Sequence, residues 1–162
     1  MNTLRTLCLV LALGLGSCVA PVAVEPDTQA VTLYFYNPAN DVDDSGNILC
    51  SPAGLVAVLR QVDAALKGEA LIQATLDLLL AGELTAEEVE QGVTTEFPLD
   101  GVTLESVAME GSTLSLTFND PNFQTSGGAC RAGILWAQVE ATARQFPGVP
   151  DIRVQPDEAF QP

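Results

Sequence analysis

The chain contains the segment Val102-Thr103-Leu104-Glu105-Ser106-Val107-Ala108-Met109-Glu110-Gly111-Ser112-Thr113-Leu114-Ser115-Leu116-Thr117-Phe118, in which two runs of β-forming residues flank a glycine turn. In the second run, Leu114, Leu116 and Phe118 alternate with polar residues, which is the period of a strand with one buried face. In the first run the alternation slips after Leu104, which indicates a β-bulge. The segment therefore predicts a β-hairpin.

Further elements are predicted on both sides of this hairpin. Val31–Tyr36 alternates as a strand does. Residues 48–50 and then 55–60 are consistent with a returning, irregular strand that is interrupted at 51–54. Residues 67–81 and 129–145 carry apolar positions at helical spacing, and 151–155 is a last short strand. The order of strand, helix, hairpin, helix and strand predicts an α+β fold with a small mixed or antiparallel sheet and two helices packed on one face.

The composition excludes several classes of function. The 162 residues suit one domain, and 48% of them are hydrophobic, so a packed core is expected. With 21 acidic and 6 basic residues the formal charge is −15, which argues against nucleic acid because phosphate binding needs clustered Lys and Arg. Because histidine is absent, Ser-His-Asp and Cys-His catalysis and imidazole-based zinc sites are excluded.

The N-terminus has the pattern of an exported lipoprotein. A single basic residue, Arg5, precedes an apolar run of about ten residues, as in secretory signals. The sequence Leu15-Gly16-Ser17-Cys18 resembles the bacterial lipobox, in which the signal is cut before an acylated cysteine. We therefore expect residues 1–17 to be a signal peptide, Cys18 to be the lipidation site, and residues 18–30 to form a flexible tether to the membrane. An uncleaved membrane anchor and plain secretion are the alternatives.

The remaining cysteines fit an oxidising compartment. Cys8 lies within the expected signal peptide, so Cys50 and Cys130 are the two left in the exported domain. A disulfide between them is expected in that setting. The alternative is a reactive Cys130 thiolate at a helix N-terminus, which would need a base other than histidine.

The segment Asp41-Val42-Asp43-Asp44-Ser45-Gly46 is similar to the start of a calcium loop, where carboxylates alternate ahead of a glycine turn. The candidate ligands are Asp41, Asp43 and Ser45, with calcium as the candidate cofactor. Position twelve is Pro52 instead of the bidentate glutamate, and no helix precedes the loop. An acidic solvated turn is the alternative interpretation.

The whole pattern resembles the GerMN domain family of bacterial sporulation and spore germination proteins. The resemblance covers residues 31–155 and leaves 156–162 as a loose C-terminal tail. It is carried by the segments Val31-Thr32-Leu33-Tyr34-Phe35, Leu78-Leu79-Leu80-Ala81-Gly82, Gly92-Val93-Thr94-Thr95-Glu96-Phe97-Pro98, the hairpin, Ser126-Gly127-Gly128, Gln145-Phe146-Pro147-Gly148-Val149 and Ile152-Arg153-Val154.

The resemblance implies an extracytoplasmic module, similar in fold to ring-building modules of secretion assemblies and without catalytic residues to carry over. The sequence departs from the family in its single copy and its long acidic loop, 37–47. A family match indicates the fold more directly than the function.

Two functions are compatible with these observations. The first is a non-enzymatic module, anchored by lipid to the extracytoplasmic side of the cell membrane, that acts through protein–protein or cell-envelope contact. The alternative is an exported acidic hydrolase or a calcium-dependent ligand-binding domain. The sequence does not identify the envelope protein partner.

Overall fold

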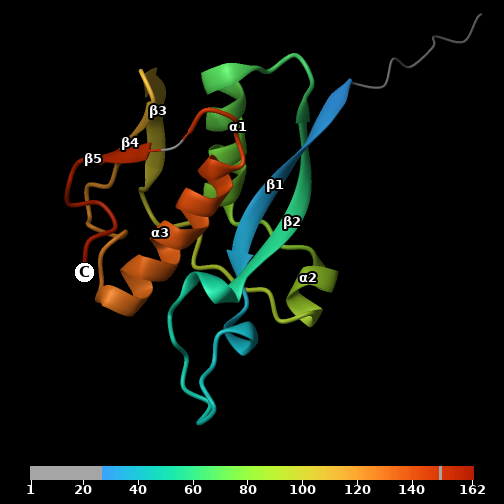
Figure 1. Cartoon of the computed structure of the whole chain (residues 1–162), viewed down its shortest axis with the longest axis vertical. Coiled ribbons are helices and arrows are strands. Elements are labelled where there is room, and N and C mark those ends of the chain that lie inside the picture. The colour runs from blue at the N-terminus through green and yellow to red at the C-terminus, as the bar shows by residue number, and fades with distance from the viewer. Residues whose placement is uncertain (1–26, 150) are drawn as a thin grey trace, which may run out of the picture.

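The computed structural model describes residues 27–149 and 151–162, which fold into two small sheets and three α-helices (Figure 1). The predicted α+β class is confirmed. The expected signal peptide, Cys18 and the tether up to residue 26 lie outside the described residues.

The predicted hairpin and its bulge are confirmed. β3 (Thr103–Glu110) pairs antiparallel with β4 (Thr113–Asn119), and the register shifts between Leu104 and Ser106. β5 (Asp151–Gln155) adds to the other side of β4 in parallel orientation, so the sheet order is β3-β4-β5. The predicted mixed sheet is this three-stranded one.

The first two strands form a separate sheet of their own. β1 (Thr28–Tyr36) and β2 (Leu55–Asp63) pair antiparallel along nine residues each. The returning strand that the sequence predicts is present, but it is regular and does not include residues 48–50, because the interrupting Pro52–Gly54 forms a 3-10 turn that ends before β2 begins. The tether also ends earlier than expected, since Thr28 already pairs with Asp63.

Three α-helices follow the order of the chain: α1 (Gly68–Ala81), the short α2 (Ala86–Glu90) and α3 (Ala129–Arg144). α1 packs on β3, β1 and α3 and so joins both sheets in one core. The buried stripe predicted for the second long helix is present, because Leu135, Val139 and Thr142 are each at most 1% exposed. These residues share the core with Leu114 and Leu116 of β4, as the helix-on-sheet arrangement requires.

Side chains at the end of α3 explain why the strands form two sheets. The Gln145 side chain accepts a hydrogen bond from the Thr32 N–H at 2.8 Å and donates one to the Thr32 carbonyl at 2.6 Å. The Thr142 hydroxyl accepts from the Tyr34 N–H at 3.1 Å. These contacts, together with an isolated backbone bridge between Tyr36 and Thr94, occupy the β1 edge that β2 leaves open. No strand pairs there within the described residues.

The C-terminal segment belongs to the core, which corrects the expectation of a loose tail at 156–162. Ala159 and Phe160 are 5% and 7% exposed. The Phe160 ring meets Phe118 of β4 edge to face, with centroids 5.2 Å apart, and lies 5.8 Å from Trp136 of α3. The tail therefore closes one end of the space between α3 and the sheet.

Within residues 27–149 and 151–162, no helix combines the length and apolar character that crossing a bilayer requires.

We expect Phe160→Ala to lower the free energy of unfolding by about 3 kcal/mol, because it leaves a cavity beside Phe118 and Trp136. The matched control is Phe123→Ala: the Phe123 side chain is 68% exposed, and its loss should change stability by no more than about 0.5 kcal/mol. Urea unfolding of both variants measures the difference. Equal stability of the two variants would show that the tail does not belong to the core.

Candidate functional site

A disulfide joins Cys50 to Cys130, with the two Cα atoms 5.2 Å apart. It ties the loop between β1 and β2 to the first turn of α3. The two residues are 80 positions apart, and closing a loop of that length stabilises a fold by roughly 4 kcal/mol in the chain-entropy model. Since both sulfurs are in the bond, neither is available as a thiolate nucleophile while it is intact.

Asp41 is a buried anchor of the same loop. Its carboxylate accepts hydrogen bonds from the Tyr36 hydroxyl at 2.6 Å, the Ser51 N–H at 2.6 Å and the Ser51 hydroxyl at 2.5 Å. The Ser51 and Tyr36 hydrogen bonds hold the pKa of Asp41 below its usual value. Burial, together with the hydrogen bond to Asp41, raises the pKa of Tyr36 to about 12. The network fixes the base of the loop.

Asp43 folds the tip of the loop. Its carboxylate accepts from the N–H groups of Ser45 and Asn47, each at 2.8 Å, and from the Asn47 side-chain amide at 2.9 Å. Hydrogen bonds from Asn47 are the largest cause of the lowered pKa of Asp43. Val42 and Ile48 form an isolated antiparallel bridge across the turn.

The structure does not bring the three candidate calcium ligands together. Asp41 directs its oxygens to Tyr36 and Ser51, Asp43 directs its oxygens to the turn, and the contact from Ser45 is a donor N–H. A calcium ion needs six to eight converging oxygen ligands. Among the described residues no group of three Asp, Glu, Cys or His side chains is placed to hold a metal. The solvated acidic turn is the interpretation that the geometry favours.

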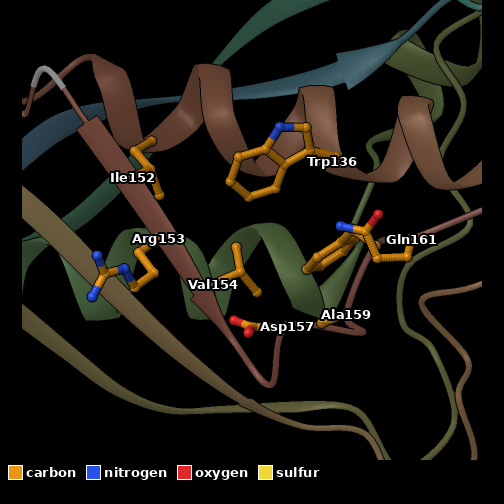
Figure 2. Close-up of a pocket in the computed structure, with 8 residues that line it drawn as sticks. Trp136, Ile152, Arg153, Val154, Asp157, Ala159 and Gln161 are labelled. Carbon is orange, nitrogen blue, oxygen red and sulfur yellow. The ribbon is translucent and has the colours of Figure 1, made fainter.

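An open groove, which the sequence did not indicate, lies between α3 and β5 (Figure 2). Its volume is about 470 Å³. The residues that line it come from α3, β5 and the C-terminal segment: Trp136, Ile152, Arg153, Val154, Asp157, Ala159, Phe160 and Gln161. The Trp136 side chain faces this groove and is only half-buried.

Arg153 differs from the other basic side chains. Arg60, Arg131 and Arg144 form ion pairs with Glu88, Glu96 and Glu140, and Lys67 contacts Gln29. Among the basic residues that the structure describes, Arg153 is the one whose side chain forms neither a hydrogen bond nor an ion pair. An exposed, unpaired cation on the strand that borders the groove is a candidate contact for a carboxylate.

The buried position of Asp41 gives a pH-dependent prediction. Because its folded pKa is lowered, the carboxylate stabilises the fold above its unfolded pKa of about 4, and this stabilisation is lost as pH falls through the folded value. We expect Asp41→Asn to be less stable than the wild type at pH 7, with a difference that shrinks below about pH 4.

The exposed Asp44→Asn is the matched control and should follow the wild type throughout. Urea unfolding across a pH series checks both variants. A deficit of Asp41→Asn that stays constant from neutral pH to about pH 2 would contradict the role of the ionised carboxylate.

Comparisons with known proteins agree with this fold. The tandem GerMN domains of the sporulation protein GerM from Bacillus subtilis match with a TM-score of 0.54 at 20% identity, over 82% of this chain and 41% of that chain. At this identity the match shows the fold, and the chain spans less than half of that structure. A search of curated protein sequences gives no significant match.

A family model named Germane, with the description "Sporulation and spore germination", matches residues 32–159. The matched region runs from β1 to the buried Ala159, and so takes in both sheets, α1 and α3. It covers most of the chain and confirms the GerMN-like resemblance seen in the sequence. The chain therefore belongs to the Germane family of sporulation and spore germination.

Proposed function

We propose that this chain is a non-enzymatic, lipid-anchored module of the cell envelope that acts outside the cytoplasm through contact with other envelope proteins. The observation that carries the proposal is the loop 41–50, which the Cys50–Cys130 disulfide and buried Asp41 hold in place while it displays aliphatic side chains to solvent. The Germane family match supports a module of this kind.

The disulfide supports export. Such bonds form and persist in oxidising compartments and are rare in the cytosol. The lipobox-like Leu15-Gly16-Ser17-Cys18 is consistent with an export signal that ends at a lipidation site, Cys18. Loss of residues 1–17 removes one basic residue, Arg5, and no acid, so the exported domain would carry 5 − 21 = −16. An anionic bilayer surface repels a domain of this charge, so we infer that the lipid holds it at the membrane.

The exposed side chains of the loop support contact with a protein. Val42, Ile48 and Leu49 are 45%, 52% and 57% exposed. Large apolar residues that gather on one exposed segment are typical of interaction sites, whereas single ones need no explanation. Because the loop is already fixed, little conformational entropy is lost when a partner binds it. Figure 1 shows the loop at the end of the molecule opposite the start of β1, where the tether would enter.

The lipid anchor is tested by Cys18→Ala, which should abolish incorporation of labelled fatty acid and move the protein out of the membrane fraction. Cys8→Ala is the matched control, because Cys8 lies in the expected signal peptide and its loss should leave labelling unchanged. Unchanged labelling of Cys18→Ala would remove lipid anchoring from the proposal.

The contact surface is tested by placing a photo-crosslinking amino acid at position 48 in cells with intact membranes. We expect one or a few discrete protein adducts, identified by mass spectrometry. The same probe at Ser112, in the exposed β3–β4 turn, is the control and should give none of these adducts. The same adducts from both positions, or none from position 48, would contradict the assignment of the loop as a contact surface.

A further inference from the structure

The outer edge of β5 is open. β4 pairs with one side of β5, and within the described residues no strand lies on its other side. No hydrogen bond from outside the sheet reaches the backbone of residues 151–155 in that part of the chain. An edge strand with unpaired N–H and C=O groups can pair with a strand of another chain.

The edge of β1 provides a comparison within the same molecule. There the side chains of Gln145 and Thr142 bond to the backbone of Thr32 and Tyr34 and occupy the edge. β5 has no such cover in the described structure. The chain thus closes one sheet edge with side chains and leaves another open beside a groove.

The two faces of β5 differ in character. Ile152 and Val154 are in register with the buried Leu114 and Leu116, so they lie on the helix side and line the groove with Trp136. Arg153 is in register with Ser115 on the opposite face of the sheet. In Figure 2 the Arg153 side chain extends from the strand on the side away from Trp136.

This alternation sets the side chains that an added strand would need. Residues of a neighbouring strand project alternately to the two faces of the sheet, with opposite residues close enough to interact. A residue opposite Ile152 or Val154 would enter the groove, whose walls include the rings of Trp136 and Phe160. A residue opposite Arg153 would meet an exposed cation that has no partner in the described structure.

We propose that the open edge of β5 binds an extended strand of a partner protein in which an acidic residue, opposite Arg153, is flanked by two aliphatic residues that enter the groove beside Trp136. This inference rests on the proposed function, a module that works through protein contact, and adds to the loop 41–50 a second contact site with a sequence preference. The pattern is aliphatic–acidic–aliphatic, and the main-chain hydrogen bonds supply affinity while the three side chains supply specificity.

A second copy of the chain fits this edge less well. Antiparallel pairing of two β5 strands over all five residues would set Arg153 directly opposite Arg153, and like charges at opposed positions are destabilising. We therefore expect the added strand to come from another protein and to carry the acidic residue opposite Arg153. Self-association through β5 is one outcome that the test can detect.

The test uses two blocked heptapeptides that differ at the central residue, Thr-Thr-Val-Glu-Val-Thr-Thr and Thr-Thr-Val-Lys-Val-Thr-Thr. The chain has a single tryptophan, Trp136, so its fluorescence reports directly on the groove. The overall charge of −15 attracts the Lys peptide, whereas Arg153 attracts the Glu peptide. Recognition by Arg153 therefore predicts higher affinity for the Glu peptide, and attraction by the net charge predicts higher affinity for the Lys peptide.

We expect saturable changes in Trp136 fluorescence, with the Glu peptide binding about two- to five-fold more tightly than the Lys peptide. Arg153→Glu should reverse this order. Lys67→Glu makes the same change in net charge at an exposed residue that precedes α1, and it should keep the wild-type order. Amide hydrogen exchange in β5 should slow when the Glu peptide is bound, as strand addition requires.

The proposal is overturned if neither peptide changes the fluorescence, if the Lys peptide binds the wild type as tightly or more tightly, or if Arg153→Glu leaves the order unchanged. It is also overturned if sedimentation shows a wild-type dimer that Arg153→Glu dissociates, because a second copy would then occupy the edge. These failures are distinguishable from failure of the proposed function, because Cys18 lipidation and crosslinking from position 48 do not depend on β5.

Discussion

The paired hydrogen bonds between the Gln145 side chain and the backbone of Thr32 are the constraint on which the arrangement of the layers depends. An amide side chain offers a donor and an acceptor together, so it can satisfy a strand edge as a neighbouring peptide group would. With Thr142 on Tyr34, it attaches the end of α3 to β1 and prevents the two sheets from joining at this edge. Because α1 packs on both sheets as well, the small domain has one core despite its two sheets.

In this arrangement the two surfaces proposed for partner contact, the loop 41–50 and the edge of β5, are exposed. The disulfide and the Asp41 network fix a loop that displays aliphatic side chains, and the short β5 exposes an unpaired edge next to a groove lined by Trp136. The loop is held by these bonds and β5 by its pairing with β4 before any partner arrives, which lowers the entropic cost of binding. A domain with a strong negative charge gains specificity from such local features, since its overall field repels most acidic surfaces.

The sequence predicted the features that depend on local periodicity and missed those that depend on distant contacts. The spacing of apolar residues predicts the hairpin, its bulge after Leu104 and the buried stripe of α3. The hydrogen bonds of Gln145 to Thr32 span 113 positions, and no spacing rule identifies a glutamine that covers a strand edge. Phe160 was assigned to a loose tail because an isolated aromatic residue among polar neighbours has no periodic pattern. The groove was missed for the same reason, since Trp136 and β5 come together only in the folded chain.

The claim that the outer edge of β1 is closed and that of β5 is open is tested most directly by amide hydrogen exchange of the free protein, followed residue by residue with NMR. The N–H groups of Thr32 and Tyr34 should exchange slowly, because the side chains of Gln145 and Thr142 accept their hydrogen bonds. The β5 amides that do not face β4 should exchange rapidly, at rates close to those of exposed loop amides. Slow exchange of these β5 amides in the free monomer, comparable to that of Thr32, would contradict an open edge.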